Sequence, residues 1–302
     1  MDNKNILITG GTGLIGKHLT NALLEKGCKV SLLSRKAGDN PKVKTYTWDV
    51  DKQEIDPDCI TGIDTIIHLA GAGIADKPWT DARKKEIVDS RTKSIRLIYD
   101  LMRKKSHQVT TVISASGINY YGDSGNKLLE ESDLPANDFV GNCCVEWEKA
   151  VDEGVEFGLR TVKYRTGVVL TQEGGALPKL ATPVKLYVGS PLGNGKQWVP
   201  WIHPQDVTNM YLYALETPEL AGAFNMVAPN PVTNKALTKA VAKQLHKPLW
   251  APNLPAFLIK LLFGEMASLV LGSTRASAQK IQDNGFTFRY PDVESALKEI
   301  YG

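Results

Sequence analysis

A glycine-rich turn close to the beginning of the chain constrains the fold more than any other feature. An apolar run at residues 5–9 leads into the turn, and an amphipathic run at residues 14–26 follows it. The glycines between them are Gly10, Gly11, Gly13 and Gly16. Glycines at this spacing let the backbone turn tightly and approach a pyrophosphate, which the N-terminus of the following helix attracts. The pattern predicts a dinucleotide-binding turn between a strand and a helix.

Two other interpretations of this turn stay open. Residues 11–17 nearly form the GxxxxGK signature of a P-loop, which would indicate nucleoside triphosphate hydrolysis. The next residue is His18, so the Ser or Thr hydroxyl that would hold Mg²⁺ is missing. Leu14 and Ile15 also suit the start of a helix better than a phosphate cradle. The dinucleotide interpretation is therefore favoured over a P-loop and over a turn with a purely structural role.

The first half of the chain alternates short apolar runs with longer amphipathic ones. The runs that predict strands are residues 5–9, 29–33, 64–69, 109–114 and 159–164. The runs that predict helices are residues 14–26, 82–104 and 139–157. This alternation is typical of βαβ units and of a parallel sheet flanked by helices. We therefore expect an α/β fold with a Rossmann-type doubly wound parallel sheet.

The second half is less regular. It contains a Gly/Pro-rich stretch at 174–204, and it predicts helices at 207–216, at 233–245 and after Pro255, with a strand at 223–227. We expect an NADP-binding Rossmann domain at 1–165 and a smaller C-terminal α/β substrate-binding region at 166–302, partly interleaved with the first.

Composition narrows the class of protein. The 302 residues are 42% hydrophobic and 23% charged, and the net charge is only +3. These values are ordinary for a soluble enzyme, and the small charge gives no electrostatic footprint for nucleic-acid binding. The four cysteines show no spacing typical of a metal site, so they indicate reduced thiols in a cytoplasmic protein, and no metal is expected.

The most apolar stretch of the second half, residues 254–271, predicts no membrane span. A spanning helix needs roughly 20 apolar residues, whereas Lys260, Gly264 and Glu265 interrupt this stretch. It predicts instead a pair of buried or interface helices. The stretch is a candidate for a homodimer contact and equally for a lid over a pocket.

The residues after the second predicted strand indicate which dinucleotide is bound. An acidic side chain there would bind the ribose 2′-hydroxyl of NAD, but the sequence has Ser34, Arg35 and Lys36. A hydroxyl and a guanidinium suit a 2′-phosphate. These residues favour NADP(H), and the alternative is a solvated basic loop.

Motifs along nearly the whole chain resemble those of the extended short-chain dehydrogenase/reductase superfamily, in particular its atypical "epimerase family protein" branch. They are His68 to Ala72, Trp79-Thr80, Ser90-Arg91, Ser114 to Ser116, Tyr120 to Gly122, Trp147-Glu148, Arg165 to Leu170, Pro191 to Gln197, Trp201 to His203, Asn225 to Pro229 and Gly285 to Pro291. Together they are far more specific than the glycine turn alone.

The resemblance implies a cofactor pocket wider than the turn. Asp49 would lie near the adenine, residues 69–71 would pass along the phosphate and nicotinamide side, and Glu86 and Arg91 would face the cofactor from the next helix. A surface pair is the alternative for Glu86 and Arg91. The residues predicted to bind NADP(H) are Gly10, Thr12, Gly13, Leu14, Ile15, Gly16, Ser34, Arg35, Asp49, Leu69, Ala70, Gly71, Glu86 and Arg91.

The sequence departs from the superfamily at its catalytic pair. The superfamily uses Tyr-x-x-x-Lys on a helix, where the lysine lowers the tyrosine pKa for proton exchange with the substrate. Alignment on Trp147-Glu148 places that pair at Val140 and Cys144, which cannot do this chemistry. The Ser or Thr usually found before the Tyr-Gly pair falls at Gly117. The standard machinery is absent.

Several side chains remain as candidates near the expected nicotinamide position. They are Ser114, Ser116, Tyr120, Tyr121 and Cys144. Tyr121 is the best proton donor among them, and Ser116 is the second predicted catalytic residue. The alternative for Tyr121 is simple packing.

Four further positions have structural interpretations. Cys143 and Cys144 are expected to be small buried residues rather than nucleophiles. His203 is expected to be a hydrogen-bonded pocket residue and Asp206 a helix N-cap.

The substrate is a small molecule that the resemblance does not name. After residues 193–197 the sequence continues with Trp198, Pro200 and Trp201, which predict an aromatic wall rather than an arginine clamp for a diphosphate, although Lys196 could partly substitute. We expect an NADP-dependent oxidoreductase or epimerase-like enzyme acting on a small carbonyl or hydroxyl compound. A cofactor-binding sensor or scaffold that has lost catalysis is the alternative.

Overall fold

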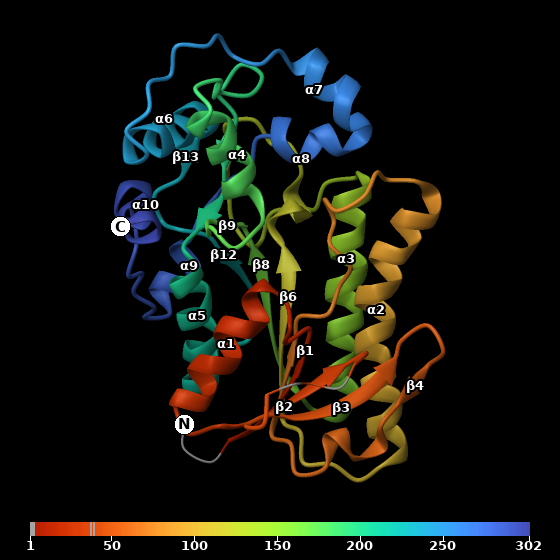
Figure 1. The fold of residues 1–302 in the computed structure, drawn as a ribbon. Coiled ribbons are helices and arrows are strands. Elements are labelled where there is room, and N and C mark those ends of the chain that lie inside the picture. The colour runs from red at the N-terminus through yellow and green to blue at the C-terminus, as the bar shows by residue number, and fades with distance from the viewer. Residues whose placement is uncertain (1–3, 37, 39) are drawn as a thin grey trace.

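One large sheet organises the molecule. The computed structural model describes residues 4–36, 38 and 40–302 (Figure 1). The strand order in this sheet is β12-β8-β6-β5-β1-β2-β3-β4. Its strands are β1 (Asn5–Thr9), β2 (Lys29–Ser34), β3 (Lys44–Asp49), β4 (Glu54–Ile55), β5 (Thr65–His68), β6 (Thr111–Gly117), β8 (Arg160–Thr166) and β12 (Gly222–Met226).

The sheet is parallel except at one edge. Every neighbouring pair from β12 to β3 is parallel, and only β4 runs antiparallel, to β3. The chain crosses from β1 outward to β2 and β3, and then back past β1 to β5 and β6. This reversal beside β1 is the topological switch point of a doubly wound fold, where such sheets bind their ligands. The predicted Rossmann-type sheet is confirmed.

Two helical layers cover the sheet. Helices α1 (Leu14–Glu25) and α5 (Pro204–Glu216) lie together on one face, and α2 (Asp81–Lys104) and α3 (Phe139–Asp152) lie together on the other (Figure 1). Side-chain N-caps start three of these helices: the Thr80 hydroxyl accepts from Arg83 N in α2, the Asp138 carboxylate accepts from Gly141 N in α3, and His203 Nδ1 accepts from Gln205 N in α5.

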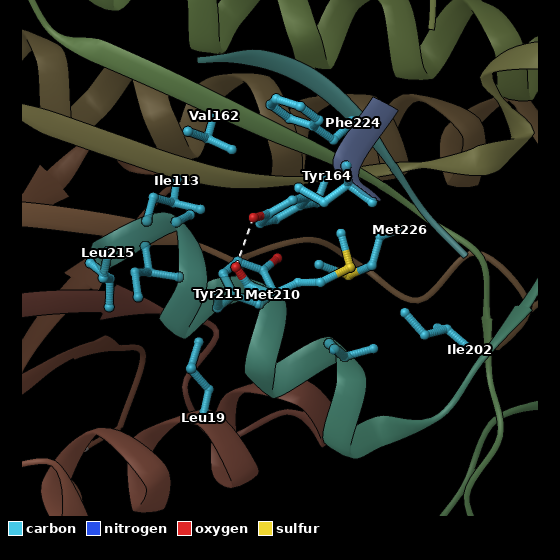
Figure 2. Close-up of a cluster of buried hydrophobic side chains, with 14 of the residues drawn as sticks. Leu19, Ile113, Val162, Tyr164, Ile202, Met210, Tyr211, Leu215, Phe224 and Met226 are labelled. Atoms are coloured by element: carbon cyan, nitrogen blue, oxygen red, sulfur yellow. Dashed lines mark hydrogen bonds between the residues drawn. The ribbon is translucent and has the colours of Figure 1, made fainter. Parts of the chain in front are cut away.

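A separate apolar core fills each side of the sheet. Figure 2 shows part of the core beneath α5, where Tyr164 from β8 points at the helix. Its hydroxyl donates to the carbonyl oxygen of Met210 at 2.7 Å, so the only polar atom of this buried ring is paired. Leu19 of α1 and Phe224 of β12 belong to the same cluster, which fixes α1 over the sheet. The core therefore positions the glycine turn that precedes α1.

The second half of the chain contributes to the sheet as well as forming a body of its own. Strand β12 pairs with β8, and α5 packs on α1. A third apolar core lies among α4 (Ala176–Lys185), α6 (Asn234–Gln244) and α10 (Val293–Tyr301). These contacts link the two halves of the chain, and the division into two partly interleaved regions at residue 165 stays a prediction.

Short elements complete the C-terminal region and its junction with the sheet. Small strand pairs join β9 (Val168–Val169) to β11 (Trp201–Ile202), β10 (Trp198–Val199) to β13 (Val232–Thr233), and β7 (Leu128–Leu129) to β14 (Arg275–Ala276). The remaining α-helices are α7 (Ala256–Phe263), α8 (Ser268–Leu271) and α9 (Gln279–Asp283), and the 3₁₀ turns are η1 (Pro57–Ile60), η2 (Ile118–Tyr121), η3 (Glu153–Phe157) and η4 (Gly264–Ala267).

Residues 254–271 form helices that are only partly buried in this chain. Ile259 and Ala267 are buried, whereas Phe257, Leu261, Leu262, Phe263 and Val270 are exposed, and a role as a homodimer contact stays a prediction. None of the helices in the described part of the chain is both long and apolar enough to span a membrane.

Candidate cofactor and substrate site

The glycine turn between β1 and α1 is held in a shape that larger residues would not permit. Gly10 has a φ of +69°, and a Cβ there would lie 2.7 Å from the backbone carbonyl group of Leu69. A Cβ on Gly16 would lie 2.4 Å from the carbonyl oxygen of Gly10. These contacts explain why residues 10 and 16 are glycine.

The N-terminus of α1 is exposed and carries no side-chain cap. Gly13 is the N-cap residue and has no side chain to bond the first turn, and no acidic residue lies in that turn. Thr12 and Gly13 are exposed, and Leu14 and Ile15 are half-buried. The first N–H groups of a helix have no partner within it, and together with the helix dipole they favour a phosphate. The turn therefore fits the pyrophosphate of a dinucleotide.

Thr9 joins the ends of the two central strands. Its hydroxyl accepts from the backbone N–H of Leu69 at 3.2 Å and of Ala70 at 3.1 Å. The bonds hold residues 69–71 beside the glycine turn, and their contact with the cofactor stays a prediction. Sequence reasoning missed Thr9, although its place at the carboxyl end of the first strand was a usable signal.

The residues at and directly after the end of β2 lie at the same edge of the sheet as the glycine turn. Ser34 is half-buried and Arg35 is exposed. Glu86 of α2 accepts from Arg83 at 2.8 Å, and this bond lowers the pKa of the Glu86 carboxyl, with a smaller contribution from the nearby charge of Arg35. Arg35 and Glu86 are therefore brought to one region of the structure, although Arg35 follows β2 and Glu86 lies in α2.

Asp49 has local partners at the end of β3. Its carboxylate accepts from the backbone N–H groups of Asp51 and Lys52, and these bonds close the turn into β4. Lys52 also contributes most to lowering the pKa of Asp49. Because β3 neighbours β2, Asp49 lies at the edge where an adenine is expected, and its role there stays a prediction.

Arg91 carries a positive charge without an acidic partner among the described residues. Its guanidinium donates to the carbonyl oxygen of Ile87 at 2.8 Å and lies 5.0 Å from the centre of the Trp147 ring. Burial lowers its pKa. A Cβ on Gly71 would lie 3.1 Å from the guanidinium carbon, so Arg91 borders the predicted cofactor loop. Arg91 and Glu86 do not pair with each other in the structure.

Tyr121 is bonded on both sides within a buried polar network. Its hydroxyl accepts from Arg165 at 2.8 Å and donates to the side-chain carbonyl of Asn225 at 2.8 Å. Burial raises its pKa to about 12, against the effect of the neighbouring Arg165. A proton donor in catalysis would have to leave one of these partners and reach the substrate.

Ser116 belongs to the same network. It donates to a carboxylate oxygen of Glu148 at 2.7 Å, and Glu148 also accepts two hydrogen bonds from the Arg165 guanidinium. The structure therefore brings the two predicted catalytic residues, Tyr121 and Ser116, together through Arg165 and Glu148. Their catalytic role stays a prediction, and the contacts themselves are of the kind that fixes a core.

The cysteines at the start of α3 are buried thiols. Burial raises the pKa of Cys143, and it raises that of Cys144 to about 12. The Cys144 sulfur would lie 3.2 Å from a Cβ on Gly117, so it packs against the end of β6. High pKa values leave little thiolate at neutral pH, in accord with the expectation that neither cysteine is a nucleophile.

The expected N-cap at Asp206 is wrong. His203 caps α5, because its Nδ1 accepts from the backbone N–H of Gln205. The Asp206 carboxylate accepts instead from the N–H groups of Arg289 and Tyr290, at 2.8 Å and 3.0 Å. A carboxylate that docks a segment 83 residues away gives no local sequence signal, whereas the local capping position does.

The expected aromatic wall is also different in detail. Trp201 is fully buried, and its indole donates to the carbonyl oxygen of Asn230. Trp198 is half-buried, and the guanidinium of Arg275 lies 4.6 Å from the centre of its ring. Sequence reasoning missed this arginine because it comes from β14, far along the chain. Of the two tryptophans, only Trp198 is partly exposed, and the guanidinium of Arg275 stacks on its ring.

In the described part of the chain, no group of three or more His, Cys, Asp or Glu side chains is arranged to hold a metal ion.

Comparison with known proteins identifies this arrangement. Residues 6–142 match the model of the NAD dependent epimerase/dehydratase family, and residues 254–300 match a domain of unknown function, DUF1731. The chain is 37% identical over 298 residues to the epimerase family protein YfhF of Bacillus subtilis, covering 98% of this chain and 97% of that protein. The chain belongs to the NAD-dependent epimerase/dehydratase family.

Solved structures of similar proteins agree with this assignment. The human epimerase family protein SDR39U1, crystallised with NADPH, superposes with a TM-score of 0.86 at 29% identity and covers 98% of this chain and 99% of its own. A nucleoside-diphosphate sugar epimerase from Corynebacterium glutamicum has a TM-score of 0.80 at 32% identity, with 99% of this chain and 59% of that one covered. The resemblance inferred from the motifs is confirmed.

Within this family, the chain departs from the expected catalytic pair in structure as well as in sequence. Val140 and Cys144, at the positions aligned with tyrosine and lysine, are both buried in α3. Arg91 from the neighbouring helix lowers the pKa of Cys144, but burial outweighs its effect. The family membership thus fixes the fold and the cofactor class, while the chemistry has to be argued from the residues present.

Proposed function

We propose that the chain is an NADP(H)-dependent oxidoreductase or epimerase-like enzyme acting on a small carbonyl or hydroxyl compound. One observation carries the proposal: an uncapped helix N-terminus, preceded by a turn whose shape requires glycine, stands at the switch point of a parallel sheet. That the human relative was crystallised with NADPH supports it. A bound nicotinamide would supply the hydride chemistry.

Residues around the turn divide the cofactor between them in this proposal. The N–H groups at the start of α1 hold the pyrophosphate, and Ser34 and Arg35 hold the 2′-phosphate of the adenosine. Residues 69–71 line the path toward the nicotinamide, where Arg91 provides a positive charge. Arg35 is exposed, so it is free to turn toward a phosphate without breaking a buried contact.

The decisive test is titration of the purified protein with NADPH and NADH, followed by nicotinamide fluorescence. We expect NADPH to bind more tightly than NADH. Arg35→Ala should weaken NADPH binding by about tenfold or more, because it removes a charge-assisted contact, and should leave NADH unaffected. Lys36→Ala is the matched control, since Lys36 is also exposed and basic but is not assigned to the phosphate. If neither nucleotide binds, the proposal is wrong.

A second candidate function has its own supporting observation. Tyr121 is held by Arg165 and Asn225, and the aligned catalytic pair is absent, which is compatible with a cofactor-binding sensor. Incubation with NADPH and a panel of aldehydes and ketones separates the two functions. NADPH oxidation supports the enzyme, whereas tight binding without turnover of any compound supports the sensor.

A further inference from the structure

A groove lies between two segments that are far apart in the sequence. Residues 75–79, which precede α2, form one wall, and residues 262–266, at the end of α7 and in η4, form the other. Its volume is about 490 Å³. Small-molecule sites are typically clefts of roughly 300–1,000 Å³. In Figure 1, α7 lies above the ends of α2 and α3, at the side of the sheet toward which β6 points.

The groove has an apolar lining on both walls. Pro78 and Trp79 contribute from one side, and Leu262, Phe263 and Met266 from the other. Its charged lining residues are Asp76, Lys77 and Glu265, all of them largely exposed to solvent. No arginine lines the groove within the described residues, so its chemistry does not suit a diphosphate. It suits an apolar group.

The walls are held in place by contacts outside the groove. The Trp79 indole donates to the carbonyl oxygen of Ile74 at 2.8 Å, and its ring packs edge-on against Phe139 at 5.0 Å. Lys84 of α2 pairs with Glu265 at 2.5 Å, which ties one wall to the other. The Lys84 ammonium also lies 5.5 Å from the centre of the Phe139 ring. The groove is therefore formed before any ligand enters.

The groove lies close to the proposed cofactor. Ala75 is four residues after Gly71, and four residues of chain span at most about 14 Å. Phe139, which supports Trp79, is the first residue of α3, the helix in which Cys144 packs against the end of β6. A molecule reacting at the strand ends can thus extend into this groove.

We propose that this groove binds the apolar chain of the substrate, so that the carbonyl or hydroxyl compound is one with an alkyl or acyl tail. The inference rests on the proposed function, because it assigns the tail of the molecule whose polar end would face the cofactor. It also explains why Leu262 and Phe263 are exposed at the end of α7: in the complex they would be covered by the tail.

The test is calorimetric titration with hexanol, octanol and decanol, with and without saturating NADPH. Alcohols cannot be reduced by NADPH, so binding is measured without turnover. Burial of each methylene favours binding by up to about fourfold, so we expect the Kd to fall by about tenfold for each two-carbon step. Equal affinity for the three alcohols, or no binding of any, overturns the inference.

Two neighbouring leucines provide a matched pair of variants. Leu262 lines the groove and is 72% exposed, whereas Leu261 does not line it and is 79% exposed. Both substitutions are made on one exposed helix, so neither is expected to unfold the protein. Leu262→Gln should raise the Kd for decanol by about tenfold, and Leu261→Gln should leave it within twofold.

Other occupants of this surface give different results. If both variants weaken decanol equally, the alcohol binds the general apolar surface of α7 and the inference fails. If sedimentation shows a dimer that both variants dissociate, a second copy covers α7, and the inference fails too. NADPH titration of the same samples keeps the two proposals apart. If the protein binds NADPH but none of the alcohols, only the proposed groove for the substrate tail is wrong. If it binds the alcohols but not NADPH, only the proposed cofactor is wrong.

Discussion

Arg165 of β8 donates to both carboxylate oxygens of Glu148 of α3, at 2.8 Å and 2.9 Å, and both side chains are buried. The two residues join the sheet to the helix that covers it. Burial alone would lower the pKa of Arg165. The hydrogen bonds that Arg165 donates to the Glu148 carboxylate outweigh the effect of burial and raise that pKa. The pair also holds Ser116 and Tyr121, so its loss would disturb the whole network below the proposed nicotinamide position.

Removal of one member of this pair should destabilise the fold strongly. Glu148→Ala leaves the Arg165 guanidinium buried without its partner, and such changes cost about 3–5 kcal/mol. The free energy of unfolding from urea denaturation measures the effect. Glu146→Ala is the control on the same helix, because Glu146 is half-exposed and pairs with Lys149 at the surface. Its effect should stay within about 0.5 kcal/mol. Equal effects of the two substitutions would contradict the prediction.

The role of Tyr121 can be separated from that of its network. Tyr121→Phe removes the hydroxyl that accepts from Arg165 and donates to Asn225, and leaves the ring in place. We expect a loss of about 1–3 kcal/mol of stability and an NADPH Kd within twofold of the original. Urea denaturation and NADPH titration measure the two quantities.

An unchanged stability would contradict that expectation. A fall of a hundredfold or more in kcat for a substrate found in the carbonyl screen, with stability and the NADPH Kd intact, would instead support the predicted catalytic role of Tyr121.

Much of the sheet could be predicted because local patterns determine it. The glycine turn, the strand before it and the helix after it lie where the sequence placed them, since each depends on adjacent residues. Strand β3 (Lys44–Asp49) was not predicted, because only Tyr46 and Trp48 of its six residues are buried, and it lacks the run of aliphatic residues that marks the central strands. Helix α4 was missed within a stretch rich in glycine and proline.

The site was less predictable because long-range contacts build it. Asp206 binds a backbone segment 83 residues away, and Arg275 stacks on Trp198 from a distant strand. Neither contact leaves a spacing that a sequence can reveal. The exposure of the apolar side chains of α7 could not be predicted either, because a sequence shows that residues are hydrophobic but not which other residues pack against them. The glycine turn could therefore be predicted from adjacent residues, whereas the side chains around it are positioned by tertiary packing.

His68 should make stability depend on pH. The ring is fully buried between Ser94 and Ser114, and burial, with a smaller contribution from Arg91, lowers its pKa from 6.5 to about 3. Between pH 6.5 and 3 the unfolded chain binds a proton that the folded chain does not. Stability is therefore complete above pH 6.5 and falls as the pH is lowered, by about 1.4 kcal/mol for each unit from this group.

The slope of stability against pH tests this expectation better than stability at one pH. In His68→Gln the slope between pH 6.5 and 4 should be smaller by about one proton, whatever the substitution costs at neutral pH. His246→Asn is the control: His246 is exposed and has a φ of +53°, which asparagine tolerates. This variant should keep the original slope. A His68→Gln protein with an unchanged slope would show that His68 does not titrate as described.

A substitution at Gly13 should affect the proposed binding of NADPH without affecting the folding of the turn. Its φ is −76°, an angle open to any residue, and a Cβ there would meet only the carbonyl oxygen of Gly10, at 3.2 Å. Gly13→Ala should therefore cost at most about 1 kcal/mol in a urea denaturation. The added methyl group would stand at the N-terminus of α1, where the pyrophosphate is proposed to bind, so the NADPH Kd should rise tenfold or more.

Gly10→Ala is the contrasting variant. Because Gly10 has a positive φ and a Cβ there would lie 2.7 Å from Leu69, this variant should lose both stability and NADPH binding. A Gly13→Ala protein that binds NADPH normally would place the pyrophosphate elsewhere.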